Sequence, residues 1–280
     1  MISLLIATMG VASAANLDGV ADECHDVATQ LQADISAGTA DYSETAQQDF
    51  LLNYFSMATT YSPLHGPIPG KPGSGSLSLE IAVIPPLGCK ERLVLGATKT
   101  EDTNKAPAAP RPRLGFVFNE LGPITPYGSV AYVPPVTVFG TRNVIVSGEA
   151  GFGAKAGDLL QYGMRYHFTL MKTVAEIATP FNKEDEAVDD FYVGSTFGID
   201  AMAGKQFGAW TPYLAVGFTD ASTFFYIGDD AVVSNNGSPY AGLTSSLGVQ
   251  YTRKWLDLAA EAYAAPGAIY TARLRAGAVF

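Results

Sequence analysis

Along most of the chain, apolar and polar residues alternate with a period of two, which is the pattern of strands with one face in an apolar environment. After residue 75 the alternation recurs in about ten segments bounded by turn-forming residues. The segments are 76–84, 113–118, 125–133, 143–153, 159–168, 190–203, 209–218, 240–252, 255–264 and 269–279. The pattern predicts an all-β, antiparallel body over residues 76–280.

The two faces of these strands separate cleanly. From Tyr270 to Phe280 every even-numbered residue is apolar or aromatic, whereas the other face carries Arg273 and Arg275. The same separation holds in 159–168, where Arg165 and His167 oppose an apolar face. In a soluble sandwich the apolar face is the core, and in a membrane barrel it meets lipid. The alternation of apolar and polar residues alone does not distinguish between these two folds.

The first quarter of the chain has a different pattern. Between Leu17 and Ile35, apolar residues recur at helical spacing, which predicts an amphipathic helix. Asp41 and Glu44 have capping-box spacing ahead of a second helical stretch that contains Phe50 and Phe55. Residues 61–75 are rich in Pro, Gly and Ser. We therefore expect a short helical segment over 16–60, a linker over 61–75 and a β body over 76–280.

The connections between predicted strands alternate in length. Those expected to be short are 119–124, 154–158, 204–208 and 253–254, and those expected to be long are 85–112, 134–142, 169–189 and 219–239. The last connection, 265–268, is short and breaks the alternation. Tight turns at one end and long loops at the other are typical of transmembrane up-and-down barrels, so we predict one of about ten strands, within a range of eight to twelve.

The N-terminus predicts export. Residues 1–15 have no charged side chain, contain an apolar core, and end in small residues, as a signal peptide does. Export would place Cys24 and Cys89 in an oxidising compartment, where they have one possible pairing. We favour the disulfide over two separate buried thiols. Cys89 follows the first strand on the long-loop side, so a bridge requires the helical segment to run up through the lumen or the first strand to be misassigned.

Composition excludes several classes of protein. Only 16% of residues are charged, against about 25% in ordinary soluble domains. No interior stretch offers the long apolar run without proline that a transmembrane helix needs. The net charge of −10 argues against a nucleic-acid partner.

The end of the sequence carries a family resemblance. The last strand ends on Phe280 behind a face of outward apolar and aromatic residues. It resembles the C-terminal strand of bacterial outer-membrane β-barrel proteins over roughly residues 74–280. The resemblance implies that Phe280 belongs to the signal read by the barrel-assembly machinery. It also implies an outer-membrane location, with outer-membrane lipid and lipopolysaccharide as surroundings.

Two further expectations accompany this resemblance. Rings near strand ends suit interfacial girdles, although the β-propensity of aromatic residues explains them as well; they are Tyr192, Trp210, Tyr240, Tyr251, Trp255 and Tyr270. The helical segment ahead of the barrel is similar to the plug of the long-chain fatty-acid transporter family. That family has a larger barrel, so no residue roles are carried over.

The charged and titratable residues on the non-lipid face are the candidate functional residues. We expect them to line the lumen, and they are Glu80, Glu149, Arg165, His167, Asp200, Asp257, Glu261, Arg273 and Arg275. They would either line a polar pore or gate, or pair with one another and fill a narrow bore. The three histidines show no metal-ligand spacing, and no Ser/His/acid constellation is evident. We therefore expect no metal, no cofactor and no enzymatic activity.

Three functions follow. The first is a small channel or uptake protein for small or hydrophobic solutes, gated or plugged by residues 16–60. The second is a non-conducting structural or surface-interaction barrel that acts through its long outer loops. The third is an outer-membrane enzyme that acts on lipid. Single-channel conductance separates the first from the second, and lipid turnover tests the third.

Overall fold

The computed structural model describes residues 15–138, 140–157, 159–175, 190–227, 230–233 and 240–280. Its helices are η1 (Asp22–Cys24), α1 (His25–Ala37), α2 (Glu44–Ala58) and α3 (Cys89–Arg92). Its strands are β1 (Gly75–Val83), β2 (Leu93–Val94), β3 (Lys99–Thr100), β4 (Ala108–Val117), β5 (Ile124–Val138), β6 (Thr141–Ala156), β7 (Leu160–Ala175), β8 (Asp190–Lys205), β9 (Trp210–Ile227), β10 (Asp230–Val233), β11 (Tyr240–Arg253), β12 (Leu256–Ala265) and β13 (Ile269–Val279). Apart from Ala15, the predicted signal peptide lies outside the described residues.

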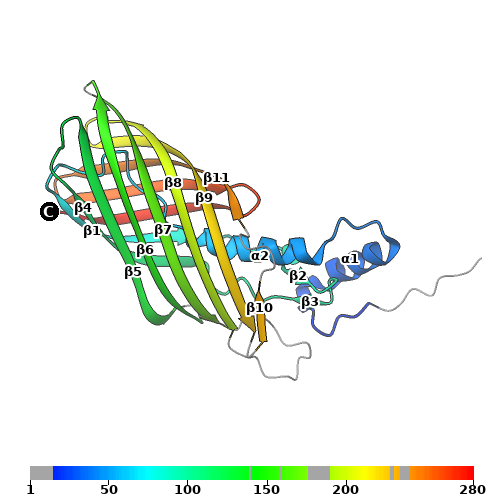
Figure 1. Ribbon diagram of the computed structural model, residues 1–280. Coiled ribbons are helices and arrows are strands. Elements are labelled where there is room, and N and C mark those ends of the chain that lie inside the picture. The colour runs from blue at the N-terminus through cyan, green and yellow to red at the C-terminus, as the bar shows by residue number, and fades with distance from the viewer. Residues whose placement is uncertain (1–14, 139, 158, 176–189, 228–229, 234–239) are drawn as a thin grey trace, which may run out of the picture.

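Ten strands form one closed antiparallel barrel (Figure 1). Their order around the wall is β1, β4, β5, β6, β7, β8, β9, β11, β12 and β13, and β13 pairs with β1 to close the ring. At the closure, Gly75 and Phe280 exchange two backbone hydrogen bonds of 2.9 and 3.0 Å. The short β10 pairs with the far end of β9. The prediction of an all-β barrel of about ten strands is confirmed, and each predicted segment corresponds to one wall strand.

The two ends of the barrel differ. We call the end that holds 118–123, 206–209, 254–255 and Phe280 the turn end, and the opposite end the loop end. The predicted long connection 134–142 is wrong, because β5 continues to Val138 and β6 begins at Thr141. The segments predicted for β7 and β9 also end too early at the loop end, because these strands continue to Ala175 and Ile227. Their neighbours continue to pair with them beyond the last clear alternation, and this pairing extends the wall.

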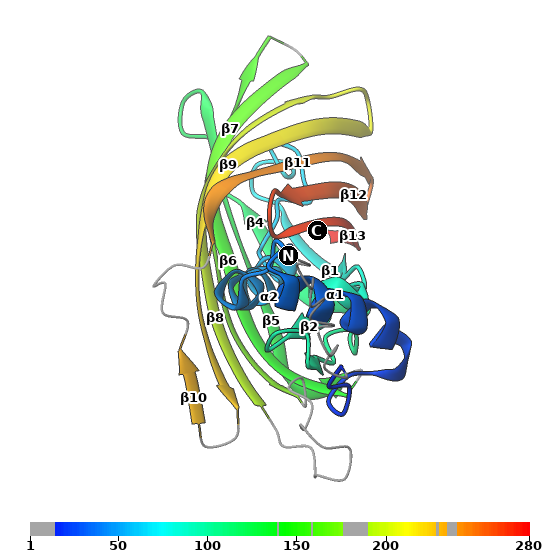
Figure 2. The same ribbon diagram turned by 90° about the vertical axis from the view of Figure 1, so that its right-hand side faces the viewer.

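A small head, made of residues 15–58 and 84–107, lies at the loop end (Figure 2). The disulfide between Cys24 and Cys89 confirms the predicted bridge, with their Cα atoms 5.3 Å apart. Around it lies a small core of Val20, Ala28, Leu31, Leu93 and Ala97. A core this small buries little apolar surface, so a covalent staple contributes strongly to its order.

Both predicted helix starts need correction. The first helix begins at His25, after a 3-10 turn, rather than at Leu17, because Gly19 forms a β-bridge with Lys99. The second helix is capped by Ser43, whose Oγ accepts a hydrogen bond from the backbone N–H of Ala46 at 3.4 Å. The cap is therefore two residues later than the spacing of Asp41 and Glu44 indicated.

Residues 59–74, which we call the strap, run through the lumen. They leave the end of α2 at the loop end and reach β1 at the turn end, where Gly73 donates to the carbonyl of Val117 at 2.8 Å. Between these points the strap contacts the inner faces of several wall strands. The disulfide is thus reached because the chain threads the lumen, but the threading segment is the strap, within the predicted linker. The helical segment expected to fill the lumen lies instead in the head at the loop end.

Candidate functional site

The part of the strap nearest to α2 is held by arginine side chains from the barrel wall. Four arginines donate hydrogen bonds to five backbone carbonyls at the end of α2 and the start of the strap. The bonds run from Arg273 to Met57 (3.1 Å) and Thr60, from Arg111 to Thr59 (2.8 Å), from Arg165 to Tyr61 (2.8 Å) and from Arg113 to Ser62 (3.2 Å). A buried carbonyl outside secondary structure needs such a donor. The arginines therefore hold the strap by its backbone, whatever its side chains are.

Three of these arginines, Arg111, Arg113 and Arg165, form ion pairs with carboxylates of the wall. The ion pairs are Glu80 with Arg111 and Arg113, Glu149 with Arg113, Arg165 (2.7 Å) and His65 (3.0 Å), and Asp200 with Arg165 (2.7 Å) and His167 (3.6 Å). Among the described residues the buried lumen charges balance, with five arginines against five carboxylates. A buried charge is tolerated only when it is paired. Taken together, the buried charges of the lumen are consequently balanced.

A second layer of wall side chains holds the part of the strap that is nearer to the turn end. Glu261 accepts from the backbone N–H of Leu64 at 3.1 Å and from the Tyr213 hydroxyl at 2.8 Å. Gln250 accepts from the N–H of Gly66 at 3.0 Å and donates to the carbonyl of Pro69 at 2.9 Å. Arg275 pairs with Asp257 at 2.5 Å in the same layer. The wall thus provides acceptors for backbone N–H groups of the strap and a donor for one of its carbonyls.

Glycines allow the strap to press against the wall. A Cβ atom at Gly153 would lie 2.3 Å from the carbonyl oxygen of Pro67, and one at Gly204 would lie 2.8 Å from the Pro67 ring. Two cavities beside the strap measure about 20 and 10 Å³. A cavity needs about 10–15 Å³ of such space to hold one water molecule. Each of these two cavities therefore has room for about one water beside the strap.

Every charged residue expected in the lumen is buried there: Glu80, Glu149, Arg165, His167, Asp200, Asp257, Glu261, Arg273 and Arg275. Glu261 and Arg273 lie opposite each other in the β12–β13 register, yet their hydrogen bonds go to different partners. The sequence analysis missed Arg111 and Arg113 as strap-binding residues. The alternation Arg-Pro-Arg carried the signal, but the prolines argued against a strand at that point.

The outer face of the wall has the opposite character. Exposed aliphatic side chains cover its middle, for example Leu77, Val130, Val216 and Leu274. Aromatic side chains ring the turn end at Phe118, Trp210, Trp255 and Phe280. A closed antiparallel wall that is apolar outside and charged inside belongs in lipid. The chain folds as a closed β-barrel with the wall of a membrane-spanning barrel.

Two predicted girdle rings of this barrel are placed differently. Tyr192 and Tyr240 point inward, with 2% and 7% of their surface exposed. The Tyr192 hydroxyl donates to the carbonyl of Leu52 in α2 at 3.1 Å. These rings support the head rather than the lipid interface. No helix among the described residues is long and apolar enough to cross a membrane.

Comparison with known proteins finds similarity in structure only. No protein-family model and no curated protein matches the sequence. The translocator domain of the autotransporter NalP from Neisseria meningitidis is 10% identical, with 93% of this chain and 99% of that chain covered and a TM-score of 0.39. The Pseudomonas putida toluene transporter TodX is 11% identical over 80% and 74%, with a TM-score of 0.34. Ail of Yersinia pestis is 14% identical over 75% and 100%, with a TM-score of 0.21. At these values the similarities carry no argument about what this barrel binds.

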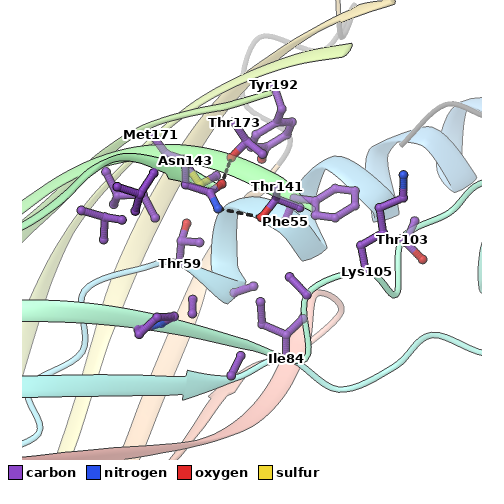
Figure 3. A pocket seen from close by; sticks show the side chains of 18 of the residues that line it. Phe55, Thr59, Ile84, Thr103, Lys105, Thr141, Asn143, Met171, Thr173 and Tyr192 are labelled. Carbon is purple, nitrogen blue, oxygen red and sulfur yellow. Dashed lines mark hydrogen bonds between the residues drawn. The ribbon is translucent and has the colours of Figure 1, made fainter. Parts of the chain in front are cut away.

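A pocket of about 90 Å³ lies in the loop-end mouth (Figure 3). Its wall is formed by apolar side chains of β5 to β8, namely Val133, Ile145, Met171 and Tyr192. Phe55 and Thr59 at the end of α2 lie between this wall and Ile84 on the opposite side. Asn143 is the polar group at its centre, and it donates to Thr141 at 2.9 Å and accepts from Thr173 at 2.6 Å. The pocket therefore offers apolar surface next to the part of the lumen that the strap occupies.

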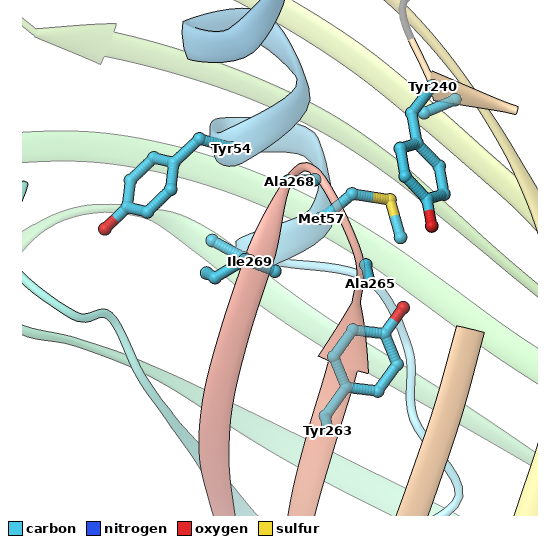
Figure 4. Close-up of a cluster of buried hydrophobic side chains, with 9 residues drawn as sticks. Tyr54, Met57, Tyr240, Tyr263, Ala265, Ala268 and Ile269 are labelled. Atoms are coloured by element: carbon cyan, nitrogen blue, oxygen red, sulfur yellow. The ribbon is translucent and has the colours of Figure 1, made fainter. Parts of the chain in front are cut away.

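The other side of α2 closes the mouth. Tyr54 and Met57 pack with Tyr240, Tyr263 and Ile269 at the loop end of β11 to β13 (Figure 4). Burial raises the pKa of Tyr54 to about 12, and its hydroxyl donates to the carbonyl of Pro85. Helix α2 is thus fixed to one half of the rim, and the pocket remains on the other half.

Proposed function

We propose that this chain is an outer-membrane binding and uptake protein for small apolar solutes, with its loop end facing outward and its axial route closed to ions. The observation that carries the proposal is the apolar mouth pocket directly above a lumen that the strap fills. A conducting pore would leave its charges facing water, whereas here they are buried and bound by other groups of the wall or by the strap. The role involves binding and transfer, with no bond made or broken in the solute.

The size and lining of the pocket define the solute. A volume of about 90 Å³ equals about three waters. It accepts the end of a short alkyl chain or part of a single ring, while the rest of the molecule emerges at the open side. Val133, Ile145 and Met171 offer aliphatic contacts, and burial of apolar area contributes roughly 25 cal/mol per Å². The charged residues of the lining, Lys105 and Asp102, pair with each other at 3.5 Å, and Asn143 binds Thr141 and Thr173.

Photolabelling tests the binding step. A diazirine analogue of hexanol, applied to the protein in lipid vesicles, should label peptides of α2, β6 and β7, and excess hexanol should compete. The substitution Ala109→Phe fills the pocket from β4 and should abolish that labelling. Ala260→Phe adds the same ring on the outward face of β12 and serves as the matched control. Labelling that is spread evenly over the barrel, or that survives Ala109→Phe, would refute the binding site.

Bilayer recordings and fractionation test the remaining parts. The intact protein should conduct ions no better than a protein-free bilayer, and it should fractionate with the outer membrane. It should also migrate faster on gels before boiling than after, because a closed barrel resists detergent unfolding. Steady wild-type conductance would contradict the sealed lumen, and recovery in the soluble periplasm would contradict the location.

A second function is favoured by the head. Its disulfide and its position beyond the loop-end mouth suit a domain displayed at the cell surface. As a surface-interaction barrel, the protein would contact outer partners or lipopolysaccharide through α1. A cysteine introduced at the exposed Gln30 should then react with an impermeant maleimide on whole cells. Protection of that cysteine in intact cells would place the head on the periplasmic side.

A further inference from the structure

The barrel wall contains a stretch where two neighbouring strands part. Pairing of β4 with β5 ends at Arg113 opposite Ala131. On either side the ladders continue toward the loop end, with β4 paired to β1 as far as Ala108 and β5 paired to β6 as far as Val138. In Figure 1, β4 and β5 lie side by side near the turn end, and β5 then slants away from β1 and β4. We call this parting the seam.

The prolines of the two strands explain where the seam begins. Val117 donates its backbone N–H to Ser74 on the β1 side, and Phe118 donates to Pro126 on the β5 side. Backbone groups of successive residues alternate between the two neighbours of a strand. The even-numbered residues of β4, including Pro110 and Pro112, therefore direct their nitrogens toward β5. Neither proline has an N–H to donate.

Strand β5, which faces β4, has a proline at the corresponding position. Continuing the β4–β5 register would place Pro110 opposite Pro134, so that rung would have no donor on either strand. The rung before it would join Pro112 to Tyr132 with one donor in place of two. Prolines in sheets are confined to edges and bulges, and the β5 register shifts between Val133 and Val136. The sequence thus specifies two free strand edges inside the wall.

The seam lies at membrane depth. Pro110 is six residues from the outward ring of Phe116; at ~3.4 Å per residue and a tilt of ~40°, it lies about 15 Å along the barrel axis. That position is within the ~25 Å apolar band of such barrels. Open strand edges do not face hydrocarbon unless they line a cavity, because their backbone groups would have no partners. A cavity or a solute path at the seam meets this requirement.

The openings on both sides share the edges of the seam. Inside, the mouth pocket is lined by Ala109 and Pro110 of β4 and by Val133 and Val136 of β5. Outside, a shallow groove is lined by Pro112 and Leu114 of β4 together with Tyr132 and Pro134 of β5. On β4, Pro110 lines the pocket and Pro112 lines the groove only two residues further along the strand. The backbone of the two parted strands therefore separates the pocket from the lipid.

We propose that the β4–β5 seam is a lateral portal through which a small apolar solute passes between the mouth pocket and the surrounding lipid. The proposal rests on the proposed uptake function and adds its route. Below the pocket the strap and the charge layers block the axis, so sideways movement is the path that keeps an apolar molecule out of the charged lumen. The prolines keep this path open by withholding the hydrogen bonds that would close it.

Closing the seam tests the route. The triple substitution Pro110→Val, Pro112→Val and Pro134→Val restores the missing donors with residues that favour strands. The amides introduced at positions 110 and 134, measured on protein in vesicles, should then exchange more slowly than amides of an unstructured chain and report that the seam has paired. Pro212→Val is the matched control, because Pro212 lies on the outward face of a paired stretch of β9.

The readout is entry of the dye phenylnaphthylamine, which brightens when it moves from water into lipid, into cells that express each variant. We expect the triple variant to admit dye at the rate of cells without the protein, while it still takes the hexanol photolabel. The control should match wild type in both measurements. A second lock, Pro112→Cys with Tyr132→Cys, should block dye entry after oxidation and restore the wild-type rate without it.

Two outcomes would overturn the proposal. Wild-type dye entry in the paired triple variant and in the oxidised cysteine variant, with photolabelling retained, would refute the lateral route and leave the proposed function standing. Absence of photolabel and of dye entry in the wild-type protein would refute the proposed function itself, and the portal with it.

Discussion

Arg273 offers a direct test of how the strap seals the lumen. Its guanidinium is fully buried, lies 4.1 Å above the centre of the Tyr263 ring, and donates to the carbonyls of Met57 and Thr60. No carboxylate of the described residues lies within ion-pairing distance of it. Replacing it with methionine of similar length removes two hydrogen bonds to the chain and breaks no direct ion pair.

The expected size of the effect follows from these bonds. A hydrogen bond to a charged group contributes about 1.5–3 kcal/mol. Arg111 retains a longer contact of 3.5 Å with the Thr60 carbonyl, so the lower value is appropriate. Arg273→Met should therefore lower the free energy of strap release by about 3 kcal/mol for two bonds. That change corresponds to a roughly 150-fold larger population of the released state.

Cysteine labelling measures that population. Ser62 is fully buried in the strap, so a cysteine at this position reacts with a small maleimide only when the strap is released. The labelling rate in vesicles should rise roughly 150-fold with Arg273→Met. Arg275→Met is the control, since it breaks the pair with Asp257 and touches no strap carbonyl. Equal labelling rates in the two variants would refute the conclusion that arginine–carbonyl bonds hold the strap.

Three further predictions concern the head and the closure of the barrel. Cys89→Ser opens a loop with a sequence separation of 65, which removes about 4 kcal/mol from the head in the chain-entropy model; proteolysis should then cleave α1 while the barrel fragment stays intact. Burial and the adjacent Glu44 raise the pKa of Tyr42. The neutral Tyr42 hydroxyl therefore contributes its full stabilisation below pH ~10, and this stabilisation is lost as the pH rises further. Tyr42→Phe should remove that alkaline loss of stability in a denaturation series. A Cβ at Gly75 would lie 2.6 Å from the Phe280 ring, so Gly75→Val should weaken the closing strand pair and reduce the fast-migrating gel form, and an unchanged gel pattern would contradict this.

Much of the architecture was determined by the sequence alone. Successive side chains of a strand point to opposite faces, so alternation identified ten wall strands and assigned Glu149, Arg165 and Arg273 to the inside. This rule needs no knowledge of neighbours. The two cysteines could pair in one way only, and threading of the lumen was one of two stated consequences.

Other features were decided by tertiary structure. The position of α2 on the rim decides which segment fills the lumen. The strap has no periodic sequence pattern from which its place in the lumen could be predicted. The partners of Arg111 and Arg113 are backbone carbonyls, which every residue possesses, so no motif records them. The seam requires the β4–β5 register, because Pro110 and Pro134 conflict only when they face each other. Pairing between distant residues is set by closure of the whole barrel, and local sequence patterns do not contain it.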